Sequence, residues 1–177
     1  MLNVLRRGHA AFQQETPTAG WKPGEDVIWI DLLKPSREEE LAVEAALGLE
    51  LPTIQEMEAL EPSSRLYQDA GATFMTASLR AHADETIPTT TPATFVLAGG
   101  RLVTLRYDAL RAFTVFSERA PAKGAASGAA ALLGLLDAIV ERLARVLDST
   151  GHRVELASVS IFQRPAAGNF RPMLTDL

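Results

Sequence analysis

The chain has 177 residues, of which 47% are hydrophobic and 22% are charged, and its formal net charge is -5 at pH 7. These proportions are those of a globular protein with a substantial core, and they exclude global disorder. The acidic balance disfavours nonspecific binding to nucleic acid or anionic lipid, and the absence of cysteine excludes disulfides, thiolate zinc sites and cysteine nucleophiles.

The first third of the chain predicts strands. Residues 2–5 and 11–14 are strand-like pieces around Gly8, which predicts a short N-terminal hairpin. Residues 27–33, VIWIDLL, form an almost continuous apolar and β-branched run, which is typical of a strand covered on both faces. Pro35 is expected to end this strand.

Two short helices are predicted next, each opened by a capping box. Ser36 with Glu39, and Thr53 with Glu56, have the spacing at which a hydroxyl and a carboxylate satisfy the free amides of a helix start. The first helix should end at Gly48, because glycine is the usual residue just after a helix.

The middle of the chain predicts two hairpins. Pro62 stops the second helix, and the turns are expected at Asp69-Ala70-Gly71 and at Gly99-Gly100. The strand segments are 65–67 with 72–79, and 95–97 with 102–105. A short helix is predicted over residues 109–116.

The strongest helix is predicted to follow Ser127, its expected N-cap. Its apolar residues fall on one face, and Glu141 with Arg145 forms a favourable i,i+4 pair. The apolar residues are Leu132, Leu136, Ile139, Val140, Leu143 and Leu147. This face favours packing on the chain's own sheet, with a coiled-coil or partner-binding role as the alternative. Pro165, Gly168 and Pro172 predict that the helix ends within 164–172.

A search for catalytic motifs is negative. The three histidines form no HxxxH or HExxH arrangement, and the glycines form no phosphate-binding pattern. No GxSxG elbow accompanies any serine. Ser63-Ser64 beside Arg65 could suggest a nucleophile with an electrophilic stabiliser, but no base is adjacent, so a turn is favoured. We therefore expect no catalytic residues and no enzyme activity.

Carboxylate clusters are the remaining polar feature. They are Glu38-Glu39-Glu40 with Glu44, and Glu56, Glu58 and Glu61. Hard oxygen ligands suit magnesium, which takes only one or two protein carboxylates, yet a solvated acidic face is the favoured interpretation. His82, Asp84 and Glu85 alternate near a strand end and could meet a metal, although a polar loop before Pro88 is favoured there. Asp84 and Glu85 are thus the candidate metal ligands.

The order of these elements resembles that of a known family. The stretch 47–76 is similar, with its two short helices, proline stop and strand, to the cytoplasmic domain of CorA-type divalent-cation transporters. The further matching segments are 29–32 with 35–39, 47–49 with 52–53, 92–97 with 102–107, and 135–142. Together they cover most of the chain from Val27 to Asp148.

The resemblance implies both a fold and a function. The fold would be an α/β/α sandwich with a central mixed sheet and a long C-terminal amphipathic helix. The family consists of homopentameric inner-membrane transporters for magnesium, cobalt, nickel or, in the ZntB branch, zinc. In its magnesium members, divalent ions between neighbouring cytoplasmic domains hold the pore closed. No tightly bound cofactor is implied beyond Mg2+, or another divalent cation, at subunit interfaces.

The departures from the family are the missing Gly-Met-Asn pore sequence and the missing membrane helices. Residues 1–177 are therefore expected to be one soluble cytoplasmic domain, cut near Leu177 before the stalk, at the cytoplasmic face of a bacterial inner membrane. No family metal ligand is carried over, and the ion transported stays open because pore residues are missing. The alternatives are a ZntB-type zinc transporter domain and a free-standing α/β small-molecule-binding domain or enzyme.

Overall fold

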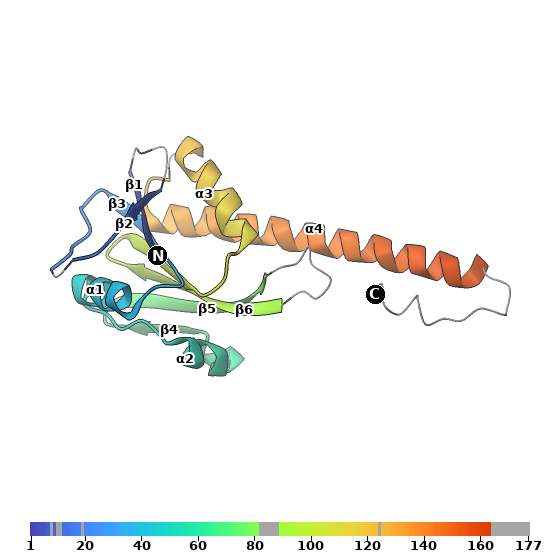
Figure 1. Ribbon diagram of the computed structural model, residues 1–177, viewed down its shortest axis with the longest axis horizontal. Helices are drawn as coiled ribbons and strands as arrows, with labels where there is room; N and C mark the ends of the chain where they lie inside the picture. Colours follow the sequence, from blue (N-terminus) through green and yellow to red (C-terminus); the bar gives the residue numbers. More distant parts are fainter. Residues whose placement is uncertain (8, 10–11, 19, 82–88, 124, 164–177) are drawn as a thin grey trace. The chain divides into compact units, whose positions relative to one another are not determined.

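The computed structural model describes residues 1–7, 9, 12–18, 20–81, 89–123 and 125–163, and its elements are drawn in Figure 1. Seven strands form one sheet: β1 Leu2–Arg6, β2 Gln13–Glu15, β3 Val27–Leu33, β4 Leu66–Asp69, β5 Ala72–Ala81, β6 Thr89–Ala98 and β7 Arg101–Arg106. The helices are α1 Arg37–Leu47, α2 Ile54–Ala59, α3 Arg111–Lys123 and α4 Gly128–Gln163, with a 3-10 turn, η1, at Pro62–Ser64.

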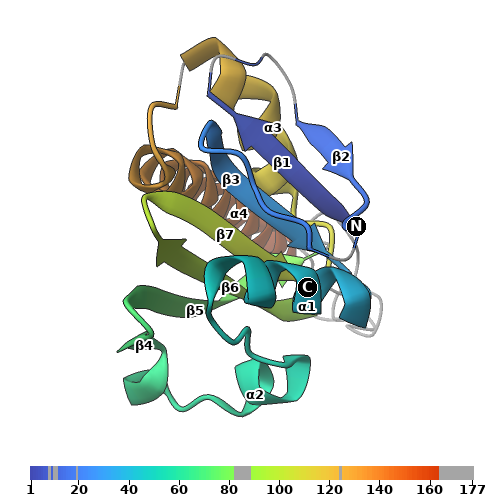
Figure 2. The same ribbon diagram turned by 90° about the vertical axis from the view of Figure 1, so that its left-hand side faces the viewer.

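The sheet is mixed, in the order β2-β1-β3-β7-β6-β5-β4. Neighbouring strands pair antiparallel except β3 and β7, which pair in parallel with Trp29 opposite Leu102 and Asp31 opposite Thr104. Figure 2 shows α1 and α2 on one face of the sheet and α3 on the other. The expected α/β/α sandwich with a central mixed sheet is confirmed.

The main core lies between the sheet and the α1–α2 layer. Its members are apolar side chains that alternate along the strands, as residues on one face of a sheet must, together with one face of each short helix. They are Leu2, Val4, Val27, Ile30, Leu32, Val43, Leu49, Leu51, Met57, Ala72, Phe74, Val96, Val103 and Leu105. The prediction that residues 27–33 form a strand covered on both faces is confirmed, since six of its seven residues are buried.

Both capping boxes are confirmed. The backbone N–H of Glu39 donates to Ser36 Oγ at 3.3 Å, and that of Glu56 donates to Thr53 Oγ1 at the same distance. Gly48 ends α1 in the left-handed conformation, with φ at 66°. Both short helices therefore begin, and α1 also ends, where local backbone chemistry favours it.

Both predicted hairpin turns are also present. Ala70 and Gly71 have φ of 47° and 76°, and Gly99 and Gly100 have φ of 54° and 80°. Two successive residues with positive φ give the turn whose twist matches that of two antiparallel strands. Glycine adopts this conformation without steric cost, which explains why three of the four positions carry it.

Most strands lie within two residues of their predicted bounds, whereas β6 and α3 extend several residues further. β6 begins at Thr89 and contains Pro92, which a central strand does not normally accept because proline lacks an N–H. The first β6 residue paired to β7 is Ala93, so at Pro92 a strand lies on one side alone. β5 reaches Ala81, and α3 runs to Lys123 rather than residue 116.

The chain forms two compact units, residues 1–138 and 139–177, and α4 contributes to both. The Ser127 cap is confirmed, because the N–H of Ala130 donates to its Oγ at 3.2 Å. In the first unit Leu132 of the predicted apolar face is buried, whereas Leu136 is 40% exposed. In the second unit Ile139 is buried, but Val140, Leu143 and Leu147 are exposed, so burial of the predicted face is confirmed only in part. The predicted helix end within 164–172 lies outside the described residues.

Candidate functional site

The described residues contain two polar sites, one on each face of the sheet. On the α3 face, a buried ion-pair cluster consists of Trp29, Asp31, Thr104 and Arg106. On the α1–α2 face, an acidic groove lies between the connection of α1 to α2 and strand β4. Their chemistry differs because one is closed and fully paired and the other is open.

The ion-pair cluster is built across the parallel β3–β7 pairing. Arg106 donates from Nε to Asp31 Oδ1 at 3.0 Å and from Nη2 to Asp31 Oδ2 at 2.7 Å, a bidentate pair. Thr104 Oγ1 donates to Asp31 Oδ1 at 2.7 Å, and it accepts from Trp29 Nε1 at 2.9 Å. The side chains of Asp31 and Arg106 are each 8% exposed. Burying two charges costs desolvation free energy, and the bidentate geometry with the added hydrogen bonds offsets that cost.

Aromatic rings enclose this cluster. The Arg106 guanidinium lies 4.5 Å from the centroid of the Phe113 ring, and Trp29 contacts Phe12 edge-on with ring centroids 4.7 Å apart. A cavity of about 220 Å³ lies beside them. Its two charged side chains already neutralise each other, so a ligand there would have to break the pair. We assign the cluster a structural role.

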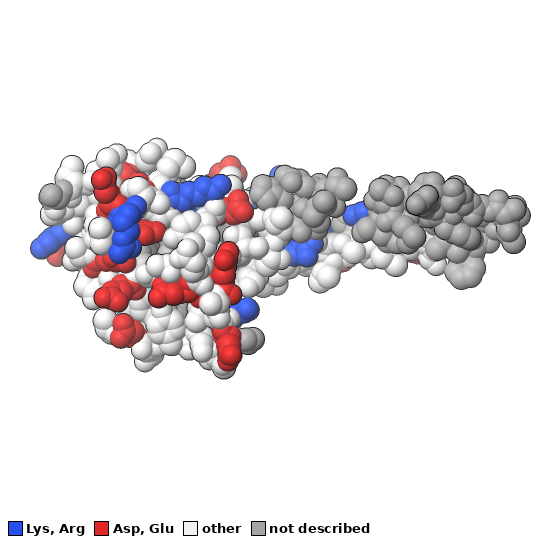
Figure 3. All heavy atoms as spheres, turned by 60° about the horizontal axis from the view of Figure 1, so that its bottom comes forward, with Lys and Arg blue, Asp and Glu red and all other residues white. Residues whose placement is uncertain are grey.

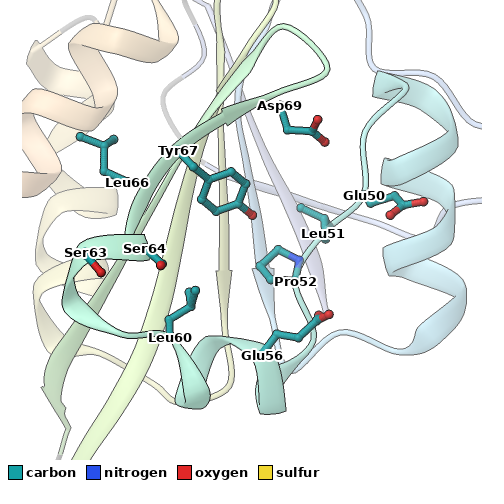
Figure 4. Close-up of a pocket in the computed structure, with 10 residues that line it drawn as sticks. All are labelled: Glu50, Leu51, Pro52, Glu56, Leu60, Ser63, Ser64, Leu66, Tyr67 and Asp69. Carbon is teal, nitrogen blue, oxygen red and sulfur yellow. The ribbon is translucent and has the colours of Figure 1, made fainter.

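The acidic groove is larger, with a volume of about 560 Å³ (Figure 4). Residues 50–52 of the α1–α2 connection supply one wall, and Tyr67 and Asp69 of β4 supply the opposite one. Glu56 of α2 and the serines of η1 line the end nearer α2. Figure 3 shows acidic side chains gathered on the part of the surface formed by α1 and α2.

An aromatic ring forms part of the groove floor. Tyr67 points into the groove in Figure 4, and its ring stacks on that of Phe74 with centroids 4.8 Å apart and planes 3° apart. The stacking fixes the ring, yet 38% of Tyr67 stays exposed. Burial raises the pKa of the Tyr67 phenol, and the nearby charges of Asp69 and Glu56 raise it further. The hydroxyl is therefore neutral at physiological pH.

The groove carboxylates are not equivalent. Glu56 Oε2 accepts hydrogen bonds from Thr53 N at 2.7 Å and Thr53 Oγ1 at 2.8 Å, and these bonds lower the pKa of Glu56. Glu50 and Asp69 are exposed, and within the described ranges neither carboxylate accepts a hydrogen bond or forms an ion pair. Two negative charges of the groove therefore have no counter-charge from the described chain.

Three of the four carboxylates of α1 accept hydrogen bonds, and the fourth, Glu38, is exposed. Glu39 accepts from the backbone amides of Ser36 and Leu2, and Glu40 accepts from the Tyr107 hydroxyl at 2.9 Å. Glu44 accepts from the amide of Leu51 at 3.0 Å. The favoured interpretation of a solvated acidic face therefore holds for Glu38 alone, since the other three are half-buried and hydrogen-bonded within the fold.

Among the residues that the structure describes, no group of three or more histidines, aspartates or glutamates is placed to hold a metal ion. The candidate ligands Asp84 and Glu85, with His82, lie outside the described residues. Ser63 and Ser64 are exposed in and beside η1, and in the described part of the chain no carboxylate or histidine is hydrogen-bonded to either hydroxyl. The preference for a turn over a nucleophile is thus supported.

Sequence reasoning did not find either polar site. The ion-pair cluster did leave a signal, because Asp31 is the one charge within the apolar strand β3, and a buried charge needs a partner. The groove left none, since its walls come from three separate elements whose residues follow no motif.

Within the described part of the chain, the helices include none with the length and apolar character needed to cross a membrane.

Comparison with curated proteins finds magnesium transporters. The magnesium transport protein CorA of Salmonella typhimurium is 29% identical over 154 residues, which are 86% of this chain and 49% of the relative. The Escherichia coli protein of the same name is 28% identical over 158 residues, 88% of this chain and 50% of the relative. The chain thus spans about half the length of the curated relatives it matches.

Solved structures show the same fold. The CorA magnesium transporter of Methanocaldococcus jannaschii matches with a TM-score of 0.69 and 17% identity, over 98% of this chain and 53% of the transporter. The ZntB cytoplasmic domain of Vibrio parahaemolyticus matches with a TM-score of 0.57 and 17% identity, over 89% of this chain and 66% of that one. A profile of the family described as "CorA-like Mg2+ transporter protein" matches residues 24–174. This match covers well over half of the sequence, and the chain therefore belongs to the CorA-like Mg2+ transporter protein family.

Proposed function

We propose that this chain is the cytoplasmic regulatory and scaffold domain of a divalent-cation transporter whose cargo is Mg2+. The observation that carries the proposal is the family match over residues 24–174, combined with coverage of about half of each magnesium-transporting relative. In this proposal residues 1–177 form one domain of a longer chain, and the stalk and membrane helices follow it. The domain itself catalyses no reaction.

The proposed regulation is an electrostatic one between subunits. Carboxylates that face each other across a subunit seam repel until a cation bridges them. Magnesium suits such a seam because it keeps several waters and needs only one or two protein carboxylates. Asp84 and Glu85 are the proposed ligands, each completed by a neighbouring subunit of a homopentamer. Loss of Mg2+ from these sites would loosen the ring and open the pore, which couples intracellular Mg2+ to transport.

The test compares oligomeric mass and heat of binding with and without Mg2+. The full-length transporter and this 177-residue chain would each be studied by sedimentation velocity and isothermal titration calorimetry. We expect Mg2+ to stabilise the full-length oligomer and to bind this chain only weakly, in the millimolar range. The double substitution Asp84→Asn with Glu85→Gln should remove the Mg2+ response of the oligomer, and Glu118→Gln, also a surface carboxylate, should not.

Two outcomes would contradict the proposal. If the full-length protein shows neither heat nor a change of mass with Mg2+, it is no magnesium sensor. If Zn2+ rather than Mg2+ is taken up by cells that carry the full-length protein, the ZntB-type alternative replaces the magnesium cargo. The reading frame also tests the free-standing alternative, because two apolar segments with Gly-Met-Asn between them are expected downstream.

A further inference from the structure

We infer that the acidic groove binds a linear aliphatic diammonium ion, of the class of 1,4-diaminobutane and the longer polyamines. This ligand is distinct from the transported cation of the proposed function. The inference rests on the size of the groove, on its apolar and aromatic lining, and on its negative charges, which come from separate elements and form no metal-binding group.

The groove has the dimensions of a small-molecule site. Its volume of about 560 Å³ falls within the range of ligand pockets in proteins, roughly 300 to 1,000 Å³. Such pockets combine a largely apolar lining with a few polar groups that orient the ligand. Here the apolar part includes Leu51, which is 7% exposed, with Pro52 and Leu60 beside it. A methylene chain would bury its surface against these side chains.

The arrangement of charge selects an elongated cation over a metal ion. Glu50, Glu56 and Asp69 all line the groove, but they are not grouped around a point where one ion could bind all three. In Figure 4 the side chains of Leu51 and Pro52 lie between the carboxylates of Glu50 and Glu56. Separated negative charges with apolar surface between them match a ligand that has an ammonium group at each end of an alkyl chain.

The aromatic ring and the hydroxyls complete the match. An ammonium group near the face of a tyrosine ring is attracted by the ring quadrupole, and Tyr67 presents a partly exposed ring held by Phe74. The hydroxyls of Ser63 and Ser64 are exposed at the same groove and can accept hydrogen bonds from ammonium donors. The unpaired charges of Glu50 and Asp69 favour a cation over a neutral ligand.

Isothermal titration calorimetry of this chain with spermidine and 1,4-diaminobutane tests the inference. Butylamine and Nα-acetyl-lysine amide, each with one ammonium group, and Mg2+ at equal ionic strength serve as comparison ligands. We expect the two polyamines to bind about two- to fivefold more tightly than the monoamines, because a second exposed ion pair adds to the affinity. Nα-acetyl-lysine amide imitates a lysine side chain of another protein, so its affinity distinguishes that kind of ligand from a free diamine.

Charge-matched variants then locate the site. Glu50→Gln and Asp69→Asn should each weaken spermidine binding about two- to fivefold, as expected for single exposed ion pairs. Glu58→Gln removes one charge from α2, outside the groove lining, and should leave the affinity unchanged. Tyr67→Leu keeps an apolar floor but should weaken binding about two- to fivefold through loss of the ring.

The controls make the result decisive. Unchanged circular dichroism and thermal midpoint would show that each variant stays folded, and chemical shifts of the Leu51 and Tyr67 amides should move on titration. Equal weakening in Glu50→Gln and Glu58→Gln would overturn the site, because binding would then follow net charge alone. Butylamine binding as tightly as 1,4-diaminobutane would overturn the diammonium assignment.

Discussion

The two faces of the sheet use charge in opposite ways. On the α3 face Asp31 and Arg106 form a buried bidentate pair, to which Thr104 adds a hydrogen bond and Phe113 an aromatic contact. On the α1–α2 face Glu50 and Asp69 border an open groove without any partner among the described residues. Aspartates in the two settings therefore have different roles, although both come from strands of one sheet.

The difference between the two faces indicates which charged residues of this fold can bind a ligand. A charge that is buried and completely paired contributes to the uniqueness of the fold, and its chemistry is unavailable to a ligand. An exposed, unpaired charge contributes little to stability, and it is free to bind. Four substitutions break or sharpen this contrast, and they follow from the largest expected effect to the smallest.

Asp31→Asn should destabilise the chain most, by about 3–5 kcal/mol, because it leaves the Arg106 guanidinium buried without its counter-charge. Urea unfolding monitored by tryptophan fluorescence would measure the free energy of unfolding. Thr104→Val removes a neutral hydrogen-bond partner of the same carboxylate and should cost less. A loss below about 1 kcal/mol for Asp31→Asn would show that the cluster does not stabilise the fold.

Gly128→Ala should destabilise by about 1–3 kcal/mol, because a Cβ there would lie 2.3 Å from the backbone carbon of Arg101 and the nitrogen of Leu102. The β6–β7 hairpin would have to shift away from the start of α4. Gly151→Ala in the same helix is the matched control, since its Cβ meets nothing within 4 Å. That change should be neutral or stabilising through helix propensity. Equal effects on the melting temperature would contradict the close contact at Gly128.

Thr53→Ala should cost about 1 kcal/mol at pH 7, because it removes the α2 cap. The hydrogen bonds from Thr53 lower the pKa of Glu56 in the folded state. Their contribution is present above the usual carboxylate pKa and is lost as pH falls through the lowered value. The stability difference between wild type and Thr53→Ala should therefore shrink in acid. A difference that grows from pH 7 to pH 3 would contradict this linkage, and Gln55→Ala on the same helix controls for composition.

Asp69→Asn should have the smallest effect, within about 0.5 kcal/mol, because Asp69 is exposed and unpaired. It is the same chemical change as Asp31→Asn on the opposite face of the sheet, so the two free energies of unfolding can be compared directly. The contrast between the faces fails if the two aspartates contribute equally to stability.

Local chemistry made much of the fold predictable. The capping boxes at Ser36 and Thr53 fix helix starts through bonds within four residues, and Gly99-Gly100 specifies a hairpin by its backbone freedom alone. The extent of β6 was not predictable, because Pro92 is acceptable only where the pairing with β7 has ended. The family resemblance identified the transporter family, since it depended on the order of elements rather than on any site.

The groove could not be predicted for a different reason. Its walls come from the α1–α2 connection, α2 and β4, and neither Glu50 nor Asp69 belongs to a spacing that signals a site. Tyr67 lines the groove with its ring stacked on Phe74, which lies opposite it in the β4–β5 register. Such sites appear only when the three-dimensional arrangement is known.

The single parallel pairing also affects how the chain folds. Strands β2-β1-β3 are joined by antiparallel neighbours close in sequence, and so are β7-β6-β5-β4, whereas the β3–β7 seam joins residues such as Asp31 and Arg106 that are 75 positions apart. Contacts of that separation carry the largest loop-closure entropy and form slowly. The two halves of the sheet are expected to form first and then join at this seam. During synthesis, β3 with Asp31 can form its parallel pairing only after β7 with Arg106 has been made.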